Sequence, residues 1–123
     1  MISTLDDYGL FANAVVTNKL LKPETINLIK TPQFERIDVK NSFTCVQGDD
    51  YTYGLGERVR IKKDSSKIPL GEFGWDGAAG SYVLFDSENK LTIVVTMSLL
   101  NWPDIFIGEH LKIASLIYAN IDL

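Results

Sequence analysis

The feature that most constrains the fold is a glycine-rich stretch, residues 71–81, which stands among segments with the composition of β-strands. Its glycines surround one tryptophan, Trp75, and strand-like apolar runs follow at residues 82–86 and 91–97. Glycine weakens a strand and usually marks a place where a ligand or another backbone comes close. The stretch is therefore either a strand edge that meets a ligand or a glycine-rich hairpin turn.

Three strands are predicted around this stretch. The first covers residues 53–61 and carries apolar residues on one face; its other face is basic, and we expect that basic face to be solvated. The second strand spans about residues 73–85, with an interruption near the glycines, and the third runs over residues 91–98. The basic positions are Arg58, Arg60 and Lys62. Short polar links between consecutive strands favour an antiparallel meander.

A helix is predicted on each side of a loop near the start of the chain. Thr4 and Asp7 have capping-box spacing, and the helix that follows has its apolar residues on one stripe. That stripe is made of Leu5, Tyr8, Ala12 and Val15, and Asn18 is a plausible stop. The second helix begins at Pro23, where a missing N–H costs nothing. Ile26 and Ile29 form its buried face, and Lys22 provides only a weak cap.

A third helix is predicted at the end of the chain, opened by residues 101–104 with Pro103 in its first turn. Its apolar stripe contains Ile107, Leu111, Ala114, Ile117 and Ile121. Residues 32–50 show little periodicity apart from a possible short strand at 43–46. The expected fold class is thus α+β, with an antiparallel meander of about three strands, a C-terminal helix that packs on it, and two N-terminal helices. A single layer of helix on sheet is the expected arrangement.

The composition is that of one folded domain, residues 1–123, with 46% hydrophobic residues. The net charge of −4 argues against a nucleic-acid surface. No apolar run approaches the roughly 18 residues of a membrane helix. Cys45 is the single cysteine and His110 the single histidine. Neither has the ligand spacing of a metal site, so no metal or cofactor is predicted, and His110 is expected on the surface.

The triplet Trp75-Asp76-Gly77 resembles the third active-site box of serine β-lactamases, penicillin-binding proteins and the esterases related to class C β-lactamases. Other segments resemble that family in the same order: residues 1–8, residues 23–25 with 31–32, and residues 53–56. The resemblance covers nearly all of this chain, but only about the C-terminal third of a family member. It implies a partial β-lactamase-like fold.

The resemblance implies that Trp75, Asp76, Gly77 and Ala78 bind substrate. In that family the residue after the box glycine, here Ala78, supplies one backbone N–H of the oxyanion hole. Gly77 would keep the strand bare so that the substrate can lie against it. Trp75 stands where many members use a lysine near the substrate carboxylate. An ester, amide or lactam substrate is therefore expected in the full-length parent, with an esterase or peptidase at least as plausible as a lactamase.

The family's nucleophile is missing from this chain. The family uses Ser-x-x-Lys at a helix N-terminus and then Tyr-x-Asn or Ser-x-Asn, both before the third box. Two literal matches occur here, at residues 87–90 and 118–120, but both follow the third box. Ser87 falls in a predicted hairpin turn, and Tyr118 falls in the last turn of the terminal helix. We therefore expect no catalytic residue in this chain and no activity from it alone.

Two functions from different classes follow. In the first, the chain is the C-terminal part of a serine hydrolase of the esterase, peptidase or penicillin-binding type. In the second, it is a non-catalytic binding or assembly module derived from that fold. The family completes its sheet with strands and a helix from the start of the domain, which this chain lacks. We therefore expect a homo-oligomer that forms through an exposed sheet edge or face.

Overall fold

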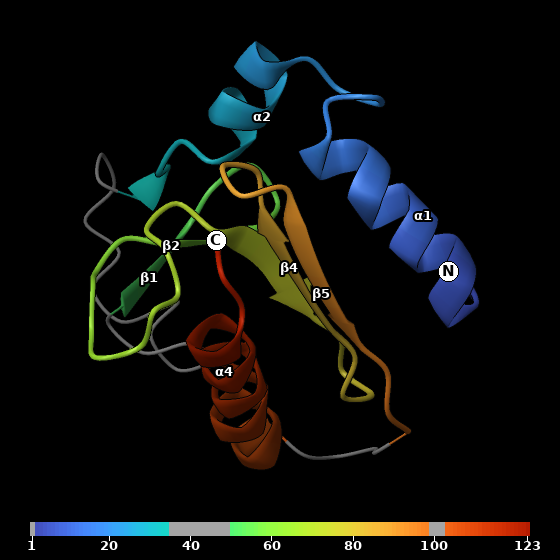
Figure 1. Ribbon diagram of the computed structural model, residues 1–123, viewed down its shortest axis with the longest axis vertical. Helices are drawn as coiled ribbons and strands as arrows, with labels where there is room; N and C mark the ends of the chain where they lie inside the picture. Colours follow the sequence, from blue (N-terminus) through green and yellow to red (C-terminus); the bar gives the residue numbers. More distant parts are fainter. Residues whose placement is uncertain (1, 35–49, 99–102) are drawn as a thin grey trace.

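The computed structural model describes residues 2–34, 50–98 and 103–123 (Figure 1). This part of the chain contains three helices: α1 (Leu5–Val16), α2 (Pro23–Ile29) and α4 (Pro103–Asn120). It also contains five strands: β1 (Tyr51–Tyr53), β2 (Arg58–Arg60), β3 (Phe73–Asp76), β4 (Tyr82–Asp86) and β5 (Leu91–Val95). The strands form one antiparallel sheet in chain order, β1-β2-β3-β4-β5, so the predicted α+β class and meander are confirmed.

The predicted number of strands is too low because two predicted strands are hairpins. The run at residues 53–61 turns back on itself: Gly54 N–H donates to the Glu57 carbonyl at 2.8 Å, and Tyr53 pairs with Arg58 across β1 and β2. Gly56 has a φ of 91°, a conformation that glycine adopts without strain. The run at residues 73–85 divides in the same way into β3 and β4. The third predicted strand is present as β5, which ends earlier, at Val95.

On the basic face predicted for the first strand, Lys62 is exposed as expected, but Arg58 and Arg60 are buried. The exposed fractions of Arg58 and Arg60 are 0% and 2%, whereas Ile61 is 42% exposed. The guanidinium carbon of Arg58 lies 4.6 Å from the ring centre of Tyr82, and that of Arg60 lies 5.4 Å from the ring of Tyr51. Aromatic rings and acidic partners therefore cover these cations, which the alternation of charges in the sequence cannot reveal.

Helices cover both faces of the sheet, which corrects the expected single layer. Side chains alternate along β4, so Val83 and Phe85 face one way and Tyr82 and Leu84 the other. The first pair packs in a core with α1 and α2, and the second pair packs in a core with α4. Figure 1 shows α1 and α4 on opposite sides of β4 and β5. As a result, every residue of β4 is buried.

The helix boundaries agree closely with the sequence patterns. Thr4 caps α1, where its Oγ1 accepts a hydrogen bond from the Asp7 N–H at 3.1 Å. Pro23 is the first residue of α2, and Lys22 makes no side-chain capping bond. Leu5 differs from the predicted apolar stripe, since it is 52% exposed. The helix α4 begins at Pro103, which lies in its first turn as predicted. The predicted strand at residues 43–46, like Cys45, lies outside the described residues.

Candidate functional site

The glycine-rich stretch folds as the end of β3 and the tight turn that leads into β4. Trp75 pairs with Val83 and Asp76 pairs with Tyr82 across the two strands. Two hydrogen bonds close the turn: Gly77 N–H donates to the Ser81 carbonyl at 2.7 Å, and Gly80 N–H donates to the Gly77 carbonyl at 2.9 Å. Ala78 lies at the exposed tip. Its N–H has no hydrogen-bond acceptor among the described residues and is available to a bound molecule.

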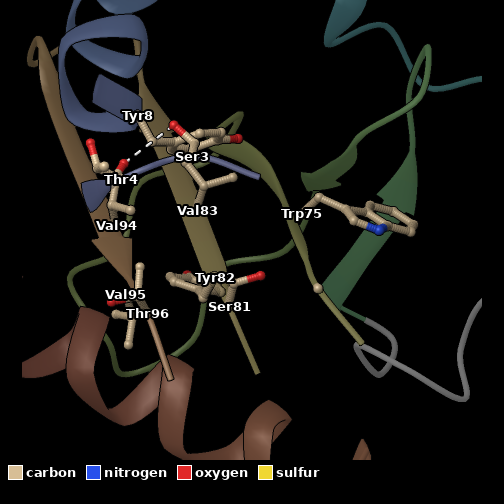
Figure 2. Close-up of a pocket in the computed structure, with 11 residues that line it drawn as sticks. Ser3, Thr4, Tyr8, Trp75, Ser81, Tyr82, Val83, Val94, Val95 and Thr96 are labelled. Atoms are coloured by element: carbon tan, nitrogen blue, oxygen red, sulfur yellow. Dashed lines mark hydrogen bonds between the residues drawn. The ribbon is translucent and has the colours of Figure 1, made fainter. Parts of the chain in front are cut away.

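A pocket of about 320 Å³ lies beside this turn. Figure 2 shows its lining residues, which come from the start of α1, from β3, β4 and their turn, and from β5 and the residue after it. The walls are largely apolar, with Trp75, Val83 and Val94 among them. Hydroxyl groups are interspersed on Ser3, Thr4, Tyr8, Ser81 and Thr96. Among the described residues that line the pocket, no side chain carries a full charge.

Tyr8 contributes one of these hydroxyl groups from α1. Its ring packs against the core formed by α1, α2 and the sheet, and it contacts Phe11 with ring centroids 5.6 Å apart. Partial burial raises the pKa of the Tyr8 phenol, and the negative charge of Glu57 raises it further. Tyr8 is therefore a neutral hydroxyl near neutral pH, able to donate or accept a hydrogen bond in the pocket.

The four residues of the sequence hypothesis separate in the structure. Trp75 and Gly77 line the pocket, and Ala78 lies at the tip of the adjacent turn. Trp75 is 41% exposed, with its ring in edge contact with Tyr53, so it is not a core residue. A Cβ atom on Gly77 would overlap the Ser81 side chain. Asp76 is not a lining residue of this pocket.

Asp76 instead belongs to a polar cluster on the α4 side of the sheet. Its Oδ2 lies 3.4 Å from Arg58 Nη1, and its Oδ1 lies 3.0 Å from His110 Nδ1. Arg58 also lies 3.7 Å from a carboxylate oxygen of Glu72 and donates to the Val83 carbonyl at 3.2 Å. Asp76 therefore connects β3, whose Trp75 lines the pocket, with the buried side chains of Arg58 and His110.

The charges in this cluster are strongly affected by burial. Burial raises the pKa of Glu72, while the nearby Arg58 guanidinium opposes that rise. Burial alone lowers the pKa of Arg58, but the neighbouring Glu72, Tyr82 and Asp76 outweigh it, so the net pKa is raised. Arg58 is therefore charged at all physiological pH values. Its charge stabilises the acidic side chains that the sheet and α4 enclose.

His110 is buried, so its predicted surface position is wrong. The side chain is 1% exposed, and its ring stacks on Tyr82 with centroids 4.7 Å apart. Its Nε2 lies 3.0 Å from the Gly80 carbonyl oxygen, in addition to the Asp76 contact of Nδ1. A sequence signal was present, because His110 lies four residues before Ala114 on the apolar stripe of α4.

The two motif matches outside the third box have structural roles. Ser87 lies in the turn between β4 and β5, as predicted, where Lys30 Nζ donates to its hydroxyl at 3.2 Å. Lys90 Nζ donates to the Ser87 carbonyl at 2.9 Å rather than to its hydroxyl. Tyr118 is buried and donates to Asp86 Oδ2 at 2.8 Å. Neither Ser87 nor Tyr118 lines the pocket. The contact of Lys30 with Ser87 joins residues 57 positions apart, beyond the reach of local sequence patterns.

No protein-family model matches this chain, and no curated protein matches it either. In the described ranges, no group of three or more His, Cys, Asp or Glu side chains could hold a metal ion. None of the helices described here has both the length and the apolar character needed to cross a membrane.

Proposed function

We propose that this chain forms the C-terminal part of a serine β-lactamase-like hydrolase and supplies one wall of its substrate cleft. The observation that carries the proposal is the pocket beside the β3–β4 turn, which Trp75 and Gly77 line next to the exposed Ala78 amide. A preorganised backbone N–H can stabilise the negative charge that develops on a substrate oxygen in the transition state. In this role Ala78 would donate one of the two oxyanion hydrogen bonds.

The apolar and uncharged lining of the pocket indicates which class of substrate it suits. Its walls are mostly apolar, and its polar groups are neutral hydroxyls, including that of Tyr8. The described lining offers no cation to pair with a substrate carboxylate, and under the resemblance Trp75 would stand where many family members have a lysine. A small uncharged ester or amide therefore fits this wall better than a carboxylate-bearing lactam.

A non-catalytic binding module is the second candidate. It is favoured by the hydroxyl groups of the pocket, none of which pairs with a lysine or histidine in the part of the chain that the structure describes. Serine needs such a base to become a nucleophile. The reading frame upstream of Met1 separates the two candidates: a continuous frame with Ser-x-x-Lys followed by Tyr-x-Asn supports the hydrolase, and its absence supports the binding module.

This chain alone is expected to form no covalent adduct with a serine-directed reagent. Ser87 lies in a hairpin turn, not at a helix N-terminus, and it does not border the pocket. Intact-mass spectrometry after incubation with a fluorophosphonate or a reactive β-lactam should therefore show the unmodified mass. Ser87→Ala is the matched control. A stoichiometric adduct that disappears in this variant would make Ser87 and Lys30 a reactive pair and contradict the proposal.

The chain is also expected to self-associate. Among the described strands, β1 and β5 lie at the two edges of the sheet, and unpaired edges recruit other strands. Large apolar side chains of α1 and α2 are also exposed, including Leu10 at 69% and Leu28 at 58%. Sedimentation velocity at a concentration on the order of 50 µM should show a dimer or larger species.

A matched pair of variants locates the contact that forms this oligomer. Leu10→Glu should shift the distribution toward the monomer if the outer face of α1 is buried between copies. Lys112→Glu, on the exposed face of α4, should leave the distribution unchanged. A wild-type chain that sediments strictly as a monomer at this concentration would contradict the expected association.

A further inference from the structure

We infer that His110 is a positioning residue that clamps the β3–β4 turn from the α4 side of the sheet, with both of its ring nitrogens acting as donors. The two partners lie on either side of the turn. Asp76 is the last residue of β3, and Gly80 closes the turn through its hydrogen bond to Gly77. The His110 side chain on α4 thus contacts residues on both sides of Ala78, namely Asp76 before it and Gly80 after it.

The chemistry of the two partners defines the protonation state that the clamp needs. Nδ1 faces a carboxylate oxygen of Asp76, and Nε2 faces the carbonyl oxygen of Gly80, each at 3.0 Å. Both partners are acceptors, and a neutral imidazole has only one N–H to donate. While Asp76 is an ionised carboxylate, both contacts can therefore be hydrogen bonds only when the ring carries two protons. With a neutral ring, one of the contacts would place two acceptors against each other.

Among the described residues, the groups that face the ring are a carboxylate and an aromatic ring, with a cation on the far side of that carboxylate. Asp76 from β3 supplies a carboxylate, and Tyr82 from β4 stacks its ring on the imidazole. Burial raises the pKa of Tyr82, so its phenol adds no charge. Within the described ranges, Arg58 from β2 is the cation that contacts Asp76 beside the ring; it is shared between Asp76 and Glu72, whose pKa burial raises. The Asp76 carboxylate thus separates the two cations by accepting from each with a different oxygen atom.

His110 contacts the β3–β4 turn from the side of the sheet opposite to the pocket. His110 lies with the α4 core, whereas Trp75 and Gly77 line the pocket near α1. A fixed turn holds the Ala78 amide in one orientation, and preorganisation of such donors is what makes them effective. The link to the oxyanion amide rests on the proposed function, while the clamp itself does not. With a single ring proton, only one of the two contacts on the turn could be a hydrogen bond, and the turn would be held less firmly.

The wild-type chain allows a direct test, because His110 is its single histidine. Nitrogen-15 NMR of the ring should show both nitrogens protonated in the folded chain at about pH 6. Hydrogen exchange of the Gly77 and Gly80 amides, corrected for the intrinsic pH dependence, should show protection that falls as the ring loses a proton at higher pH. A packing role alone would give protection independent of pH. A folded chain in which one ring nitrogen lacks a proton from about pH 5 to pH 8 would overturn the inference.

Two variants separate the donors from the packing. His110→Phe keeps a ring on Tyr82 and removes both donors, so protection of the turn amides should fall by about tenfold or more and lose its pH dependence. His110→Gln retains one donor and should recover part of the protection. Lys112→Gln, exposed on the same helix, is the matched control and should behave as wild type. Full protection in the phenylalanine variant would also overturn the inference.

These measurements use the chain without any activity assay. If these measurements show that His110 does not hold the turn, the proposed role of Ala78 is still tested separately by the hydrolysis assay. If the clamp is found but the Ala78 amide has no effect on hydrolysis, the proposed function fails and the clamp remains. Wild-type exchange and ring spectra give an answer even where a variant does not fold.

Discussion

Replacing Arg58 with methionine is expected to lower the free energy of unfolding by about 3–5 kcal/mol. Arg58 is fully buried, and its guanidinium contacts Glu72, Asp76 and the Val83 carbonyl. Methionine fills much of the same space but leaves two acidic side chains without this cation. Urea denaturation followed by circular dichroism measures the loss. Lys62→Met, at an exposed position just after the same strand, is the control and should cost less than about 0.5 kcal/mol.

The pH dependence of the Arg58→Met loss identifies its cause. Burial raises the pKa of Glu72, and Arg58 is the first group that opposes this rise. Without Arg58 the folded-state pKa of Glu72 rises further, so folding retains a proton that the unfolded chain releases. The variant should therefore lose more stability at neutral pH than at mildly acidic pH. A loss that is equal at both pH values would assign the effect to packing instead of charge.

If Ala78 has the proposed oxyanion role, its replacement by proline should reduce ester hydrolysis by about 100-fold, since loss of one oxyanion donor costs about 3 kcal/mol. Proline removes the backbone N–H while leaving the side-chain surface small. Ala78 does not adopt a left-handed φ, and Gly77 before it has no Cβ to oppose the proline ring. The assay uses a small p-nitrophenyl ester. Under the proposed function, the assay requires the full-length hydrolase, or this chain recombined with the N-terminal portion that the proposal assigns to that hydrolase.

Ala78→Val is the matched control because it keeps the N–H and enlarges the side chain. It should retain most of the hydrolysis. Circular dichroism must show both variants folded, and a cooperative urea transition confirms that the sheet is intact. Equal hydrolysis by the proline and valine variants would refute the oxyanion assignment and leave residues 75–77 as a structural turn.

The sequence patterns predicted the helices and the order of the strands because those features depend on local rules. Thr4, Pro23 and Pro103 carry capping and helix-start signals that tertiary contacts do not override. The number of strands was less predictable. Glycines such as Gly54 and Gly56 form a turn between two strands here. In the sequence, the same glycines are also compatible with one continuous strand that contains a bulge.

The buried polar cluster could not be predicted, because its members come from separate parts of the chain. Arg58 is separated in sequence from its partners Glu72, Asp76 and Val83, and His110 is separated from Asp76 and Gly80. Asp76 belongs to the predicted triplet and contacts His110 of α4. Trp75 and Gly77 both line the pocket, and the assignment of the triplet to a substrate stays a prediction.

The meander has a consequence for how this chain folds. Each described strand pairs with the strand next to it in sequence, so the ladder can form by closing one short loop at a time. Short closures lose little chain entropy, and sheets made of sequential hairpins avoid the slow search that distant pairings need. The helix α1 is different, because it packs on β4 and β5 more than sixty residues away. Among the element contacts described here, docking of α1, which closes the pocket between Tyr8 and Val94, therefore requires one of the longest loop closures, and we expect it to follow formation of the sheet.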